Sequence, residues 1–154
     1  MGLDQYLYAS RYTSSADWRP EDDRKVFKDI LKAVGGEKFV DTDLPSITVD
    51  LKVGYWRKAN QVHAWFVRKV QGGEDDCKEY WVDRDELEEL RDLCKLALKE
   101  KDKAEELLPT QSGFFFGSTE FDEWYWQDVK STIEIIDKCL KMDDTWSFKY
   151  QSSW

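Results

Sequence analysis

Histidine and cysteine are scarce in this sequence, and their scarcity limits the chemistry that it can support. His63 is the only histidine, and the three cysteines, Cys77, Cys94 and Cys139, form no closely spaced pair. Zinc sites are built from clustered Cys and His, and a disulfide framework in a small domain uses an even number of cysteines. The sequence therefore predicts no metal site, no cofactor and no disulfide framework, and it favours a reducing compartment.

Long apolar runs and an excess of basic charge are also missing. No run approaches the roughly 18 apolar residues that a membrane helix needs, and residues 1–10 lack the features of a signal peptide. The chain has 23 Lys and Arg against 32 Asp and Glu, a formal net charge of −9. Phosphate contacts need clustered Lys and Arg, so we expect no direct nucleic-acid partner. The missing apolar run and signal peptide lead us to expect a cytoplasmic protein with no membrane partner.

Patterns that mark a catalytic nucleophile or a phosphate-binding loop are absent as well. Cys77 follows three acids, which suppress the thiolate that a nucleophile requires. Ser112 and Ser118 lie outside any Gly-x-Ser-x-Gly pattern. Only phenylalanine stands between Gly113 and Gly117, where a phosphate loop would need exposed amides and a lysine. These absences favour a binding protein over an enzyme.

Aromatic residues, in contrast, are abundant. They make up 15% of the chain, with eight tryptophans, although Leu, Ile and Val could fill a core of this size. Surplus Trp and Tyr are typical of a stacking pocket or a partner surface.

The periodicity of apolar residues predicts an α+β fold in a single domain over residues 1–154. We expect a small antiparallel sheet of three or four short strands, packed with about four helices. The expected strands are residues 3–12, 46–53, 78–82 and 145–154, and the expected helices are residues 15–36, 55–71, 83–108 and 119–142. Asp83 and Glu86 have the spacing of a capping box, and Ser118 or Thr119 is expected to cap the last helix.

One helix and one loop are candidates for the walls of a binding site. The predicted helix 55–71 has Ala59, Val62, Phe66 and Val70 at core spacing, so its other faces should point outward. Those faces would supply one wall, and the loop between Gly113 and Gly117 would supply an aromatic wall opposite. The predicted ligand-binding residues are Trp56, Arg57, Lys58, Asn60, His63, Trp65, Phe114, Phe115 and Phe116. The alternative is that the phenylalanines only plug one end of the core.

Several segments resemble a family of small, largely uncharacterised proteins of tailed bacteriophages and prophages. They are "MGLDQYLY" at the start, "VGYWRKANQVHAWFV", "GEDDC" and "LLPTQSGFFFGSTEFDEWYWQDVKSTI". The resemblance implies a protein of the infected bacterial cytoplasm, with a role against host defence, and it implies no catalytic residues.

Three functions are consistent with these features. The first is a non-catalytic binding protein that sequesters a nucleotide-like signal or blocks a host defence protein. The second is an acidic mimic of nucleic acid, based on the net charge. The third is a nucleotide-directed hydrolase or transferase that uses His63 with Glu120 or Asp122. The chain could also form a homo-oligomer.

Overall fold

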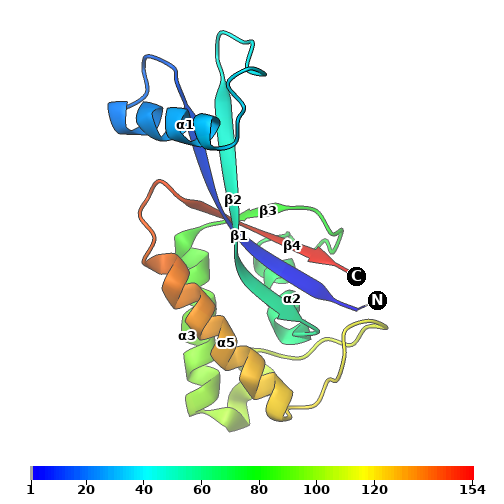
Figure 1. The fold of residues 1–154 in the computed structure, drawn as a ribbon. Coiled ribbons are helices and arrows are strands. Elements are labelled where there is room, and N and C mark those ends of the chain that lie inside the picture. The colour runs from blue at the N-terminus through cyan, green and yellow to red at the C-terminus, as the bar shows by residue number, and fades with distance from the viewer. Residues whose placement is uncertain (1) are drawn as a thin grey trace. The chain divides into compact units, whose positions relative to one another are not determined.

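The computed structural model describes residues 2–154 and has the α+β fold that the sequence predicts (Figure 1). Its four strands form one antiparallel sheet in the order β2-β1-β4-β3. The strands are β1 (Asp4–Ser14), β2 (Ser46–Arg57), β3 (Tyr80–Val82) and β4 (Ser147–Ser153). β1 and β2 have 11 and 12 residues and are longer than the short strands that we expected.

Within residues 2–154 there are five α-helices and one short 3-10 helix. They are α1 (Glu21–Ala33), α2 (Asn60–Lys69), α3 (Arg84–Lys99), η1 (Lys101–Lys103), α4 (Ala104–Leu107) and α5 (Glu123–Leu140). None of these helices is both long enough and apolar enough to cross a membrane.

The chain divides into two compact units, which are described separately. One unit comprises the residues up to Ala9 together with Leu51–Trp154, and the other comprises Ser10–Asp50. The expectation of a single domain stays a prediction.

The larger unit contains the main hydrophobic core. Helices α2, α3 and α5 lie on one side of the sheet (Figure 1). Their buried apolar side chains belong to one core cluster with those of the strands. Leu7 of β1 and Phe148 of β4 belong to the same cluster as Phe66 of α2, Leu90 of α3 and Val129 of α5. Alternation along β4 places Phe148 and Tyr150 on this face, as expected for a strand with one buried side.

The starts of two helices differ from the prediction. Residues 55–57 end strand β2, and helix α2 begins only at Asn60. Helix α5 begins at Glu123, because Asp122 and not Ser118 or Thr119 is its N-cap; the Asp122 Oδ1 accepts a hydrogen bond of 3.0 Å from the Tyr125 amide. The predicted capping box of α3 is confirmed.

The smaller unit has little core of its own. Phe27 is the one apolar residue of α1 that is buried, although the helical spacing predicts a broader apolar face. Val34, which follows α1 directly, is 71% exposed. An ion pair between Arg19 and Asp23, 2.7 Å long, and the bond from the Ser14 hydroxyl to the Pro45 carbonyl connect its segments.

Candidate functional site

The loop of residues 113–118 and helix α2 meet through the side chain of Asn60. Its Nδ2 donates to the carbonyls of Phe116 and Ser118 at 3.0 and 2.8 Å, and its Oδ1 accepts from the Gln111 amide at 3.0 Å. The Asn60 side chain is 1% exposed, the bond to Phe116 is buried, and the other two bonds are partly buried. Asn60 therefore fixes the loop from inside.

The two glycines explain how three phenylalanines fit into this loop. A Cβ on Gly113 would lie 2.6 Å from the ring of Phe116, and Gly117 has a φ of +86°, which side chains rarely tolerate. Phe116 consequently turns inward and is buried, whereas Phe114 is 95% exposed and Phe115 is half-buried. The plug interpretation holds for Phe116 alone.

His63 lies behind Phe116 and is completely buried. Its ring meets the Phe116 ring edge-on at a centroid distance of 5.2 Å. The Nδ1 lies 2.8 Å from the Tyr150 hydroxyl, and the Nε2 lies 2.8 Å from the Asp75 carboxylate. Both ring nitrogens are thus engaged by protein groups, and His63 is not available as an acid or base for a ligand.

Two predicted tryptophans are also buried. Trp56 donates from Nε1 to the Thr132 hydroxyl of α5 at 2.9 Å, and Trp65 is 1% exposed beside Phe66. Helix α2 is buried on every side from Asn60 to Val67, because the sheet, α5 and the loop of residues 113–118 all cover it.

The nine predicted ligand-binding residues therefore do not all line one open cleft between α2 and the phenylalanine loop. The two segments do come together, but Asn60, His63 and Phe116 fill the space between them. Trp56 and Trp65 are likewise core residues rather than walls of a cavity. His63 does not line the pocket that contains Glu120 and Asp122, so the structure does not bring together the residues of the hydrolase or transferase alternative.

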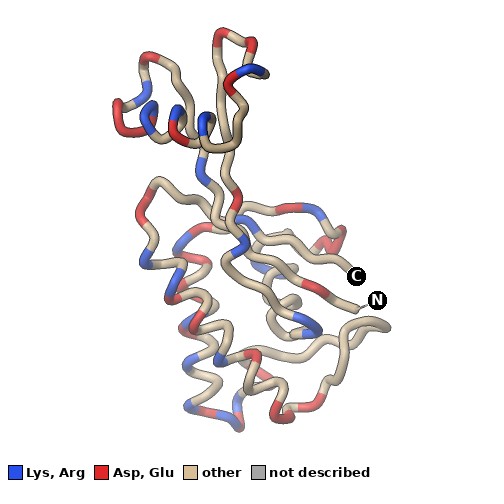
Figure 2. The backbone as a smooth tube through the Cα atoms, in the orientation of Figure 1, with Lys and Arg blue, Asp and Glu red and all other residues tan. Residues whose placement is uncertain are grey.

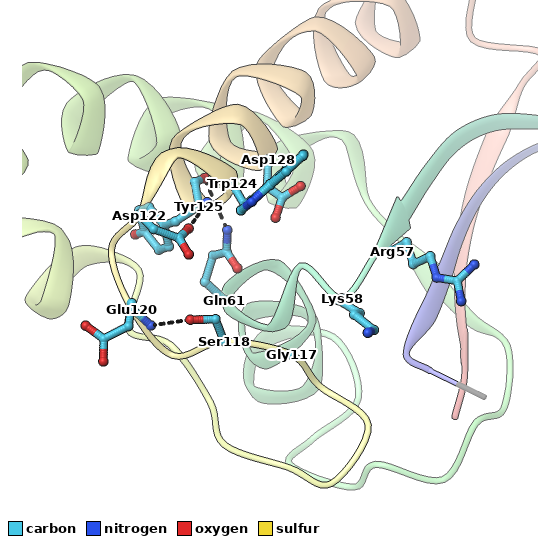
Figure 3. A pocket seen from close by; sticks show the side chains of 10 residues that line it. All are labelled: Arg57, Lys58, Gln61, Gly117, Ser118, Glu120, Asp122, Trp124, Tyr125 and Asp128. Atoms are coloured by element: carbon cyan, nitrogen blue, oxygen red, sulfur yellow. Dashed lines mark hydrogen bonds between the residues drawn. The ribbon is translucent and has the colours of Figure 1, made fainter.

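An open pocket lies next to this sealed contact, with a cavity volume of about 380 Å³ (Figure 3). It lies between the end of β2, the first turn of α2, the end of the phenylalanine loop and the start of α5. Its walls are formed by Arg57, Lys58, Gln61, Gly117, Ser118, Glu120, Asp122, Trp124, Tyr125 and Asp128. Of the predicted ligand-binding residues, Arg57 and Lys58 belong to it.

The charges in the pocket are separated. Arg57 and Lys58 lie at one end, and Glu120 and Asp122 lie at the other (Figure 3). The backbone holds Lys58 in place: its φ is 60°, its amide donates to the Leu3 carbonyl at 2.8 Å, and Gly117 packs closely against its side chain. A ligand with an anionic end would therefore have a preferred direction in this pocket.

Helix α5 supplies an aromatic ring and a carboxylate on the same face. Trp124 and Asp128 are four residues apart, the spacing at which helical side chains are neighbours. Trp124 is 77% exposed, which is unusual for so large a ring. Tyr125, between them, points inward and donates from its hydroxyl to the Leu108 carbonyl at 2.8 Å.

Asp128 has the most unusual environment in the pocket. Burial raises the pKa of its carboxyl to about 6; a hydrogen bond from Gln61 acts against this, and the nearby charge of Asp122 adds to it. Gln61 itself is 2% exposed, and its Nε2 also lies 3.4 Å from the Tyr125 carbonyl. A carboxylate in the wall of a cavity whose pKa is raised because it is partly removed from water is typical of a functional site.

Two cysteines are unsuited to nucleophilic chemistry. Burial raises the pKa of the Cys94 thiol to about 12 and that of Cys139 to about 11, so both stay protonated at neutral pH.

Across residues 2–154, no three His, Cys, Asp or Glu side chains lie close enough together to hold a metal ion.

Sequence reasoning missed most of the α5 side of the pocket. The pair of Trp124 and Asp128 could have been recognised by its spacing of four residues, since it falls off the core stripe of α5. Comparisons with protein families, with curated proteins and with solved structures gave no match for this chain.

Proposed function

We propose that this protein is a non-catalytic binding protein, which sequesters a small nucleotide-like molecule in the pocket between α2 and α5. The observation that carries the proposal is the combination in one cavity of an exposed tryptophan ring, a desolvated carboxylate and a separate cationic end. Trp124 would stack on a base, Asp128 with Gln61 would bind its polar edge, and Lys58 with Arg57 would attract a phosphate.

The size and openness of the site support a small ligand. About 380 Å³ falls in the range of ordinary small-molecule pockets, roughly 300–1,000 Å³. Gly117 and Ser118 form the floor beside Lys58 (Figure 3). The Ser118 hydroxyl already accepts a bond of 3.1 Å from the Glu120 amide, which favours a positioning role for this serine over a nucleophilic one.

The resemblance of the sequence to small phage proteins gives the proposal its biological setting. A protein that binds a nucleotide signal without turning it over would lower the concentration of free signal during a host defence response. The proposal therefore places this chain in the cytoplasm of an infected bacterium.

The acidic-mimic alternative has weaker support. A mimic of nucleic acid needs a row of uncompensated negative charge, but Lys and Arg lie among the acids of α3 and α5 (Figure 2). Arg91, for example, contacts Glu88, Asp92 and Asp137. Much of the negative charge of α3 is thus neutralised locally.

Calorimetric titration of the full chain with nucleoside monophosphates, linear dinucleotides and cyclic nucleotides tests the proposal. We expect binding to at least one of them. Replacing Trp124 with Ala should weaken that binding about tenfold to a hundredfold, because stacking on one aromatic ring is worth roughly 1–3 kcal/mol.

The matched control is Trp18→Ala. Trp18 is 73% exposed, almost as much as Trp124, but it belongs to the smaller unit and does not line the pocket. Equal losses in both variants, or no binding to any nucleotide, would reject the proposal. Recovery of the intact ligand after denaturation would distinguish sequestration from turnover.

A further inference from the structure

We infer that the base bound in this pocket is guanine, an inference that rests on the proposed function. The assignment comes from the chemistry of the polar groups beside Trp124. Guanine would be the base that this pocket prefers, and a pocket that binds nucleotides without preferring guanine would still agree with the proposed function.

An ionised carboxylate only accepts hydrogen bonds, and it offers about four lone-pair positions on two oxygens. Gln61 donates to Asp128 and uses one of these positions. The remaining positions suit a ligand edge with two adjacent donors, which a carboxylate binds in a bidentate manner. Asp128 therefore selects for the pattern of donors on the ligand.

Among the common bases, only guanine has two adjacent donors on its pairing edge, the N1–H and the 2-amino group. Adenine and cytosine each place an acceptor next to one donor. Uracil has a single N–H between two carbonyl oxygens. In each of these bases an acceptor would face a carboxylate oxygen, so a buried polar group would be left unpaired.

The other carboxylates of the pocket are less suited to this task. The Asp122 Oδ1 caps α5 by accepting from the Tyr125 amide. Glu120 lies at the far end of the pocket and points away from Gln61 (Figure 3). Asp128 is thus the carboxylate that combines desolvation with a position next to Trp124.

The geometry of the helix supports simultaneous stacking and edge recognition. Trp124 is one turn before Asp128, so the ring and the carboxylate approach a ligand from the same side of α5. A base stacked on Trp124 would present its edge to Asp128 and Gln61, and its sugar and phosphate would extend toward Lys58 and Arg57 (Figure 3).

A panel of nucleotides that differ only in the base edge tests the inference. We would titrate the full chain with the monophosphates of guanosine, adenosine, cytidine, uridine, inosine and xanthosine. Guanosine monophosphate should bind at least about tenfold tighter than the monophosphates of adenosine, cytidine, uridine and xanthosine, because each of its two donors makes a charge-assisted bond. Inosine, which lacks the 2-amino group, should lose part of this advantage.

The variant Asp128→Asn provides the sharper test. The amide has one acceptor and one donor, a pattern that matches the N1–H and C2 carbonyl of xanthine. We expect guanosine monophosphate to lose at least about tenfold in affinity and xanthosine monophosphate to become the preferred ligand. Glu134→Gln is the matched control, because it makes the same chemical change on an exposed position of α5.

The outcomes separate the two levels of the proposal. Equal affinity for all six nucleotides, or an unchanged guanine preference in Asp128→Asn, would overturn the guanine assignment and leave the proposed function standing. No binding to any nucleotide would overturn both.

Discussion

Asp128 is the residue on which the interpretation of the pocket depends. Its carboxyl is largely buried, and burial raises its pKa to about 6. Evolution of a stable fold alone would favour a neutral side chain at this position. A carboxylate that costs stability is understandable when a ligand supplies the donors that water can no longer provide.

Because the ionised Asp128 carboxylate lowers the free energy of unfolding, the stability gained in the variant Asp128→Asn should depend on pH. Since the pKa in the folded protein lies above the usual value of about 3.8, the protonated carboxyl contributes fully to stability only below about pH 3.8, and that contribution is lost as the pH rises through about 6. The shift corresponds to roughly 3 kcal/mol at most, and partial exposure reduces this to about 1 kcal/mol.

Urea unfolding at about pH 7.5 and at about pH 4 would measure the effect. The variant should be about 1 kcal/mol more stable than the natural protein at the higher pH, with no gain at the lower pH. Glu134→Gln serves as the control and should show no such difference between the two pH values. A destabilised Asp128→Asn at pH 7.5 would mean that the carboxylate is satisfied within the fold.

At the scale of elements, the phenylalanine loop and helix α2 act as one structure. Asn60 binds three backbone groups on the loop side, Phe116 covers His63, and the Phe115 carbonyl accepts from the Leu3 amide of the segment before β1 at 3.0 Å. Because Gly117 and Ser118 of this loop form the pocket floor, a loosely held loop would also loosen the site.

Replacing Asn60 with Ala should release this loop. Two carbonyls and one amide would lose their partner inside the protein, and each unsatisfied group costs about 1–3 kcal/mol. We expect the free energy of unfolding to fall by about 3 kcal/mol, and chymotrypsin to cleave at Phe114 or Phe115 before any other site.

Gln127→Ala is the comparison for this experiment. Gln127 is an exposed residue of α5 whose side-chain amide donates to the Ser131 hydroxyl at 3.4 Å. Its removal should change stability by less than about 0.5 kcal/mol. Similar losses in both variants would contradict the anchoring role of Asn60.

At the scale of the whole molecule, the net charge of −9 is distributed and not concentrated. Figure 2 shows Lys and Arg between the acids of α3 and α5. Charges more than about 8 Å apart are screened at physiological ionic strength, so a bound nucleotide would respond mainly to the charged residues that line the pocket.

The dependence of binding on salt concentration therefore distinguishes nucleotide binding in the pocket from the acidic-mimic alternative. Nucleotide affinity should change by less than about fivefold between low and high salt, because close contacts are screened less than distant ones. Capture of a basic host protein by the acidic exterior would instead weaken steeply, as expected for association driven by many exposed charges. Titrations and pull-downs over the same salt series would compare them.

The sequence by itself determined the fold class, the order of most elements and the capping of α3. Apolar periodicity and the Asp83–Glu86 spacing are local signals, and local structure follows from them. From the sequence alone, the meeting of residues 55–71 with the loop of residues 113–118 is a hypothesis; the structure brings Lys58 and Gly117 of these segments into close contact.

Only the tertiary structure decided which of these residues face a cavity. The spacing of α2 suggests one core face, but the sheet, α5 and the loop cover it from several sides, so Asn60, His63 and Trp65 are buried. The pocket joins Lys58 to Asp128 across 70 positions of sequence. Burial depends on what packs against a side chain, and no local pattern contains that information.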